Sequence, residues 1–89
     1  MSIRRHNAKR DSNEGEIVAA LEGLGCLVKR IDVPVDLLVK IRGTVHLCEV
    51  KTRRGTLTKD QSEFSAHWPI YILRSVDDAV AFVKLKRSE

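Results

Sequence analysis

Residues 35–52, VDLLVKIRGTVHLCEVKT, constrain the fold of this 89-residue chain more than any other stretch. Two apolar runs are separated here by residues 42–44, Arg-Gly-Thr, a combination typical of a tight turn. The pattern predicts an antiparallel hairpin with strands over 35–41 and 45–52. Because a hairpin folds back on itself, the start of its first strand must lie beside the end of its second.

Three charged residues interrupt these apolar runs. Asp36 stands near the start of the first strand, and Glu49 and Lys51 stand near the end of the second. Because side chains alternate along a strand, Glu49 and Lys51 share one face and lie about 6.6–7 Å apart. Pairing around the turn brings Asp36 close to both. The sequence therefore predicts two carboxylates and an ammonium group at one end of the hairpin.

The rest of the chain predicts three helices and two more strands. Asp11 and Glu14 fit a capping box for a first helix, and Thr58 and Gln61 fit one for a second. With the hairpin, the predicted elements are a helix over 12–24, a strand over 26–31, a helix from 58 to 67 or 68, a strand over 70–74 and a helix after Ser75. This α-β-β-β-α-β-α order predicts a single α/β domain, with a mixed sheet and helices on both faces.

The composition limits the binding partners and the cellular compartment that we expect for this chain. A net charge of +4 favours the binding of polyanions. Residues 1–10 are rich in basic side chains, and we expect them to form a basic arm before a domain over 11–89. No apolar run approaches the ~18–20 residues of a membrane span, and no signal-peptide pattern opens the chain. We therefore expect a soluble, cytoplasmic protein. Cys26 and Cys48 lie in apolar runs and are expected to be buried free thiols.

The predicted cluster of charges suits a hard divalent cation. Two carboxylates, here Asp36 and Glu49, with a backbone carbonyl and water are ligands that Mg²⁺ accepts. Such an ion activates water and shields the charge of a phosphate, and Lys51 could orient or deprotonate the nucleophile or stabilise developing negative charge. Without a cation the two carboxylates would repel each other, and the pKa of one would rise. A partly buried structural ion pair at a sheet edge is the alternative that these residues leave open.

The spacing of Asp36 and Glu49-x-Lys51 resembles the motif of the PD-(D/E)XK nuclease superfamily. The predicted order of elements also resembles the restriction-endonuclease-like core of that superfamily. More closely, residues 10–84 resemble a stand-alone VRR-NUC domain, the virus-type replication and repair nuclease seen in many phages. The segments that carry this resemblance are NEGEI (13–17), PVDLLV (34–39), RG (42–43), EVK (49–51), LTKDQ (57–61) and RSVDDA (74–79).

This resemblance implies a structure-selective DNA endonuclease that hydrolyses phosphodiester bonds with Mg²⁺ or Mn²⁺. Branched DNA such as a Holliday junction would be its substrate, and a homodimer its active form. If the chain is phage-encoded, the host cytoplasm would be its location. The implied metal ligands are Asp36, Glu49, the Val50 carbonyl and Glu14; the implied catalytic lysine is Lys51, and Gln61 would line the active site.

Basic residues near the motif are expected to hold the DNA backbone. Arg53 and Arg54 follow the motif in a loop, and Lys9 and Arg10 belong to the basic arm. Two other interpretations compete with the nuclease. One is a non-catalytic DNA-binding module that retains the nuclease fold, and the other is a small structural subunit whose charges only form ion pairs.

Glu14 and Gln61 each have a second interpretation. Both stand at the third helical position of a predicted capping box, where a Glu or Gln side chain accepts a hydrogen bond from the N-cap backbone. We expect that one side chain does not easily serve both a helix cap and an active site.

Overall fold

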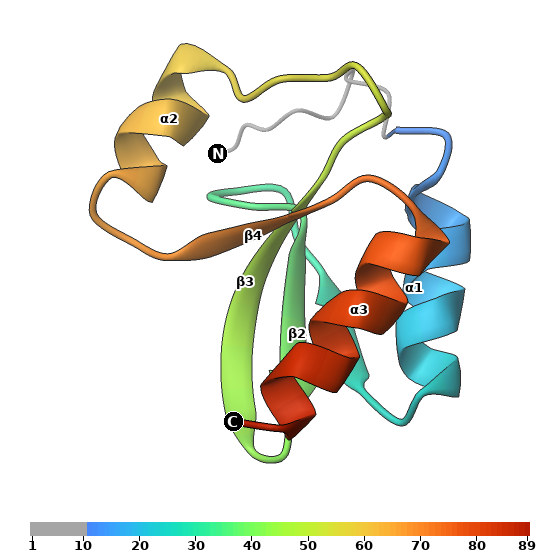
Figure 1. The fold of residues 1–89 in the computed structure, drawn as a ribbon. Coiled ribbons are helices and arrows are strands. Elements are labelled where there is room, and N and C mark those ends of the chain that lie inside the picture. Colours follow the sequence, from blue (N-terminus) through green and yellow to red (C-terminus); the bar gives the residue numbers. More distant parts are fainter. Residues whose placement is uncertain (1–10) are drawn as a thin grey trace.

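The computed structural model describes residues 11–89, which form one mixed four-stranded sheet with three helices (Figure 1). The predicted α/β class and the predicted order of elements are confirmed. The elements are α1 (Glu14–Gly23), β1 (Leu27–Arg30), β2 (Leu37–Ile41), β3 (Thr44–Val50), α2 (Lys59–Ser65), β4 (Ile70–Leu73) and α3 (Val76–Arg87). The predicted basic arm, with Lys9 and Arg10, lies outside the described residues.

The sheet has the strand order β1-β2-β3-β4. β2 pairs antiparallel with both β1 and β3, and β4 runs parallel to β3. A parallel neighbour needs a crossover connection, and here the crossover contains α2. The carboxyl ends of β3 and β4 therefore meet at the same end of the sheet.

The turn between β2 and β3 sets the register of the hairpin. Arg42 and Gly43 have positive φ angles of 53° and 83°, as a two-residue hairpin turn requires of its central residues. Ile41 pairs with Thr44 across the turn, so the turn is one residue shorter than predicted. The pairing continues to Leu37 opposite Cys48. One step further along this register, Asp36 lies opposite Glu49.

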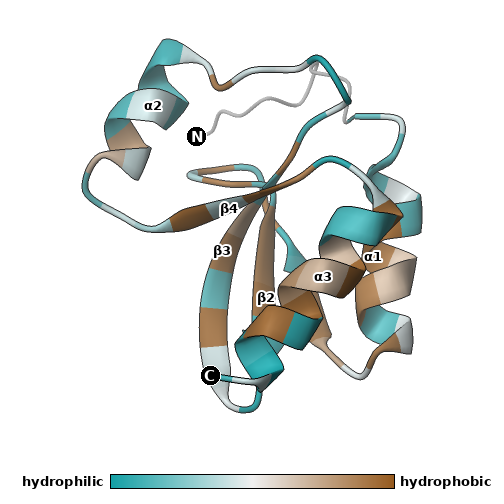
Figure 2. Ribbon diagram, in the orientation of Figure 1, coloured by the Kyte–Doolittle hydropathy of each residue, from teal (hydrophilic) through white to brown (hydrophobic). Residues whose placement is uncertain are grey.

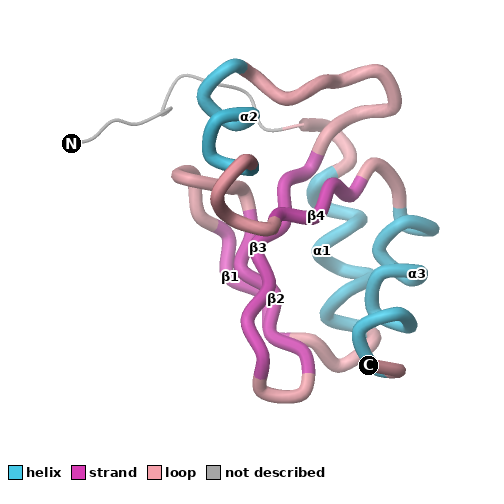
Figure 3. The backbone as a smooth tube through the Cα atoms, turned by 60° about the vertical axis from the view of Figure 1, so that its left-hand side comes forward, coloured by secondary structure: helices cyan, strands magenta, loops and turns pink. Residues whose placement is uncertain are grey.

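The core lies between one face of the sheet and the helices α1 and α3. These two helices pack side by side on that face (Figures 1 and 3). The fully buried side chains at this contact include Ile17, Leu21, Leu37, Val39, Cys48, Val50, Ala79 and Val83. Cys26 and Cys48 are both buried free thiols, as predicted. None of the helices in residues 11–89 is long and apolar enough to cross a membrane.

The opposite face of the sheet is covered at one end only, so the prediction of helices on both faces is only partly right. The short helix α2 contributes no buried residue and is largely hydrophilic (Figure 2). Its aromatic Phe64 stacks on Trp68, with ring centroids 6.0 Å apart, and Trp68 remains 57% exposed. These two rings pack on each other, and no side chain of α2 is buried. The helix α2 therefore leaves part of this face of the sheet uncovered.

The two predicted capping boxes have different outcomes. At α2, the Thr58 hydroxyl accepts from the Gln61 N–H and the Gln61 side chain accepts from the Thr58 N–H, which confirms that box. At α1, the box with Asp11 is wrong: the N-cap is Asn13, and its side chain makes no capping bond. The Asn13 amide instead bonds to the ends of two strands, which is a tertiary contact that local spacing does not reveal.

Candidate active site

Asp36 and Glu49 face each other at the open end of the hairpin, and each carboxylate accepts a backbone hydrogen bond from the opposite strand. The Asp36 N–H donates to Glu49 Oε1 at 3.2 Å, and the Val50 N–H donates to Asp36 Oδ2 at 2.8 Å. Both residues are buried, with 6% and 2% of their surfaces exposed. The register of the hairpin thus brings the two carboxylates together, as the sequence predicts.

Lys51 joins this pair at the end of β3. Its Nζ lies 3.4 Å from Glu49 Oε2, and its side chain is 14% exposed. The backbone of Lys51 is held on both sides, because its N–H donates to the Leu73 carbonyl and its own carbonyl accepts from Asn13 Nδ2, both at 3.1 Å. The backbone contacts fix where the side chain begins, and the ion pair with Glu49 directs its ammonium group toward the two carboxylates.

Gln61 reaches Glu49 from α2. Its Nε2 donates to Glu49 Oε2 at 2.6 Å, while its Oε1 accepts from the Thr58 N–H at 2.9 Å. The expectation that one side chain could not easily serve both the cap and the site is therefore wrong. The two ends of an amide carry a donor and an acceptor, so they can satisfy two partners at once.

Burial and charge make Glu49 a weak acid in the absence of a cation. Burial, followed by the negative charge of Asp36, raises the pKa of Glu49 from 4.5 to about 7, and the Lys51 ammonium only partly opposes this. The predicted rise of one pKa in the pair is thus found at Glu49. A divalent cation would favour the ionised form, because it supplies the opposite charge that the buried carboxylates need.

The donor set fits one hard cation. Each carboxylate oxygen has two lone pairs, so a carboxylate oxygen that accepts one hydrogen bond can also coordinate a cation. The Val50 carbonyl, which follows Glu49 directly, is the third ligand that the resemblance to the nuclease superfamily implies. Within residues 11–89, no group of three or more His, Cys, Asp or Glu side chains is gathered for metal binding. Two carboxylates with water suit Mg²⁺, which usually keeps part of its hydration shell.

Glu14 is buried at the start of α1, where it forms an ion pair with Arg30 of β1. Arg30 Nε lies 3.2 Å from Glu14 Oε2, and only 2% of the Glu14 surface is exposed. Arg30 was not predicted as part of the site, because its contact with Glu14 depends on how α1 packs on the sheet. The role of Glu14 as a metal ligand stays a prediction.

A turn follows Lys51 and carries Arg53 and Arg54, both exposed. The Gly55 N–H donates to the Thr52 carbonyl at 3.0 Å and closes the turn. Arg74 holds it from the end of β4, since its Nη1 donates to the carbonyls of Thr52, Arg53 and Gly55 at 2.9, 3.3 and 2.6 Å. The turn is therefore a fixed structure at the site, and its two arginines project from it.

Arg74 is a residue whose role sequence reasoning missed, although it opens the segment RSVDDA. Its carbonyl accepts from Asn13 Nδ2 at 2.9 Å, and its N–H donates to Asp78 Oδ2 at 2.9 Å. Asp78 in turn donates its backbone N–H to Ser75 Oγ at the start of α3. The Ser-x-x-Asp spacing signals a helix start, and the basic residue before it is the one sequence signal that could have pointed to Arg74.

Comparisons with known proteins identify no relative of this chain. No protein-family model, no curated protein and no solved structure matches the chain. A function for the chain must therefore be inferred from the cluster formed by Asp36, Glu49, Lys51 and Gln61.

Proposed function

We propose that this chain is a metal-dependent DNA endonuclease that resembles the VRR-NUC branch of the PD-(D/E)XK nucleases. One observation carries the proposal: Asp36 and Glu49 are buried together at the end of a hairpin, and both Lys51 and Gln61 contact Glu49. Buried charges are costly unless they are paired or bind a metal, so two adjacent buried carboxylates need a reason. The binding of a divalent cation and a phosphodiester substrate would explain why two carboxylates are buried together.

Each residue has a distinct part in the proposed hydrolysis. Asp36, Glu49 and the Val50 carbonyl would hold Mg²⁺ or Mn²⁺, which supplies Lewis-acid polarisation of the phosphate and a lowered pKa for bound water. Lys51 would orient the attacking water and stabilise negative charge on the phosphate oxygens. Gln61 keeps Glu49 in place through its 2.6 Å bond, so the carboxylate does not have to reorganise during the reaction.

The basic turn after Lys51 supports a nucleic-acid substrate. Arg53 and Arg54 are exposed next to the site and could neutralise backbone phosphates, and we extend this role to Lys9 and Arg10. The proposed mode of action is endonucleolytic. A homodimer that presents two such sites to branched DNA is part of the same proposal.

The test is cleavage of a DNA panel that includes duplexes, single strands and four-way junctions, with Mg²⁺ or Mn²⁺. Wild-type protein should cut at least one substrate, and Glu49→Ala and Lys51→Ala should each reduce the rate by a factor on the order of a hundred or more, as the removal of a charge-stabilising group does in other enzymes. Glu63→Ala and Lys84→Ala are matched controls, because both residues are exposed and lie outside the cluster. Circular dichroism checks that each variant is folded.

This experiment distinguishes the three interpretations of the sequence. Cleavage that survives Glu49→Ala would contradict the proposed site. Binding without cleavage under every condition would favour the non-catalytic DNA-binding module. A folded protein that neither binds nor cuts any DNA of the panel would favour the structural subunit.

A further inference from the structure

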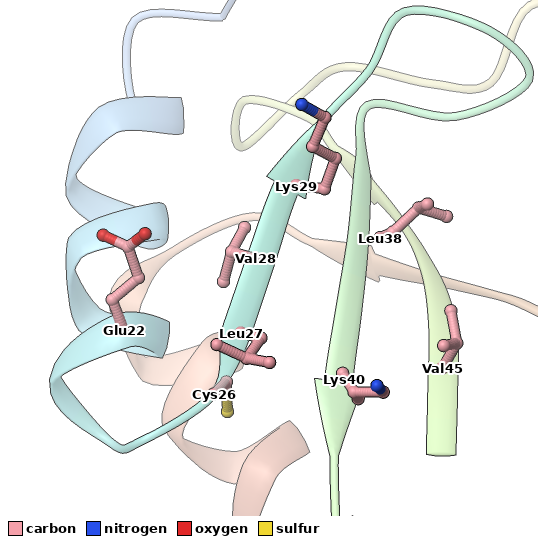
Figure 4. A pocket seen from close by; sticks show the side chains of 8 residues that line it. All are labelled: Glu22, Cys26, Leu27, Val28, Lys29, Leu38, Lys40 and Val45. Atoms are coloured by element: carbon pink, nitrogen blue, oxygen red, sulfur yellow. The ribbon is translucent and has the colours of Figure 1, made fainter. Parts of the chain in front are cut away.

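We propose that the uncovered face of the sheet binds the backbone of double-stranded DNA and leads it to the candidate active site. This inference rests on the proposed function and adds the surface on which the substrate lies. We define the open face as the side chains of Leu27, Lys29, Leu38, Lys40 and Val45, which border one shallow hollow of about 300 Å³ (Figure 4).

Strand geometry places the open face on the same side of the sheet as the candidate site. On β3, Val45 alternates with residues that point to the core, so it shares its face with Glu49. On β2, Leu38 and Lys40 have the same parity as Asp36, and the buried Leu37 and Val39 point the other way. The carboxylates and the open face therefore lie on the same side of the sheet, with the carboxylates at the end that α2 covers.

The register arranges this surface in rows across the strands. Lys29 pairs with Leu38, which pairs with Leu47, and Leu27 pairs with Lys40, which pairs with Val45. The row that contains Lys29 lies two residues from Glu49, about 7 Å along the strands, and the row that contains Lys40 lies about 13 Å away. A ligand that extends over this distance can contact both lysines and continue to the end of the sheet where the carboxylates lie.

The charge of the open face fits a polyanion. Lys29 and Lys40 are exposed, and neither forms a salt bridge with another residue of 11–89. Among the described residues, the acidic side chain that borders the hollow is Glu22, at its α1 rim. Two ammonium groups on a flat surface attract phosphates without regard to base sequence.

The five side chains of the open face include no aromatic ring, which favours the DNA backbone over stacked bases. Proteins that bind single strands without sequence preference usually stack bases on aromatic rings. Here Tyr71 and Phe82 contact each other on the core side of the sheet, and Phe64 and Trp68 belong to α2 and the residues after it. The apolar Leu27 and Val45, 68% and 53% exposed, would contact sugars between the phosphates.

A second copy of the chain is a poorer occupant of this surface. Two open faces packed together would bury Lys29 and Lys40 of each copy in an interface from which water is excluded. Burying ammonium groups without carboxylate partners is costly, and like charges repel in such a contact. Charge complementarity therefore favours the polyanion.

The test is the salt dependence of binding to a fluorescent duplex of about 20 base pairs and to a four-way junction, in EDTA to prevent cleavage. Removing one charge that neutralises a phosphate should make the slope of log K against log salt shallower by about 0.9. Lys29→Gln and Lys40→Gln should each show this change, and the double variant about twice as much. Lys84→Gln, an equal change of charge on the exposed side of α3, should leave the slope within experimental error.

Three outcomes would overturn the inference. A double variant with the wild-type slope would show that the lysines touch no phosphate. Tighter binding of a single strand of the same length than of both double-stranded probes, with loss in the double variant, would replace the duplex by a single strand. A wild-type dimer in sedimentation that Val45→Asp dissociates would assign the open face to self-association.

Failure here can be told from failure of the proposed function by assaying the same proteins with Mg²⁺. If the wild type cleaves and the double lysine variant binds and cleaves equally well, the open face is excluded and the nuclease stands. If wild type binds duplex through the two lysines and never cleaves, the surface is supported and the proposed catalysis is not.

Discussion

Gln61 connects the N-terminus of its own helix to Glu49. Its Oε1 accepts from the Thr58 N–H at 2.9 Å, and its Nε2 donates to Glu49 Oε2 at 2.6 Å. Because α2 has no buried residue, this amide is a principal tie between the helix and the sheet. The position of α2 and the orientation of the candidate metal ligand are therefore coupled through one side chain.

Replacing Gln61 by Glu separates its two roles. The carboxylate can still accept from the Thr58 N–H, so the cap should persist, but a negative oxygen would replace the donor to Glu49. We expect helix content to persist, but cleavage to fall about tenfold or more and the urea midpoint to drop, because a charge-assisted hydrogen bond is replaced by repulsion. Thr58→Ala is the matched control: it should cost about 1 kcal/mol of stability through loss of the cap and leave cleavage nearly intact. Full cleavage by Gln61→Glu would remove Gln61 from the site.

The raised pKa of Glu49 predicts that the metal-free protein loses stability as the pH rises. Between 4.5 and about 7 the folded state retains a proton that the unfolded state has released. The free energy of unfolding should therefore fall over this range and level off above it, by about 1–3 kcal/mol in all. Asp36→Asn removes the neighbouring charge and should make the curve shallower without abolishing its slope, because burial is the larger cause of the raised pKa. Urea unfolding in EDTA at about pH 5 and pH 8 measures both proteins, and parallel curves would contradict the assignment.

Metal binding should appear as a stability effect that does not depend on catalysis. Near pH 8, Mg²⁺ or Mn²⁺ at about a hundred times its dissociation constant should stabilise the wild type by about 2.7 kcal/mol. The effect should shrink near pH 5, because protons compete for Glu49. Asp36→Asn keeps an oxygen for the Val50 N–H but lacks the charge, so its melting temperature should hardly respond to metal. An equal response of both proteins would place the metal elsewhere.

Arg74 should govern the shape of the turn that follows Lys51. Arg74→Ala removes the donor shared by three carbonyls, and we expect a loss of about 1–3 kcal/mol of stability together with faster amide exchange at Gly55. Because Arg53 and Arg54 would no longer be held in place, DNA affinity should fall at least as far as it does in Arg53→Ala. Unchanged exchange at Gly55 would show that the turn is stable without the arginine.

The buried thiol of Cys48 should be inert in the folded protein. Burial raises its pKa to about 12, so almost none of it is thiolate near neutral pH, and the thiolate is the reactive form. A thiol reagent should modify Cys48 only as fast as the protein unfolds, and urea should restore fast reaction. Rapid modification without unfolding would contradict this picture of the core.

The elements and the hairpin could be predicted from local rules. Alternation along a strand, a tight turn around Gly43 and the capping box of α2 each depend on residues a few positions apart, although the turn is one residue shorter than predicted. The sequence predicted that Asp36 lies close to Glu49 and Lys51, and the observed register, with Ile41 opposite Thr44, places it directly opposite Glu49. The false capping box at α1 shows the limit of such rules, since its spacing was correct but the N-cap is Asn13 and Glu14 pairs with Arg30.

Only the tertiary structure determined the contacts between distant parts of the chain. Asn13 bonds to the carbonyls of Lys51 and Arg74, which lie 38 and 61 positions away, and Glu14 pairs with Arg30 across the α1–β1 contact. These partners meet because α1 and α3 pack on one face and β4 lies parallel to β3. The short polar α2 leaves the other face open. Local periodicity determines which face of an element is apolar, whereas the global packing determines what each polar side chain finds there.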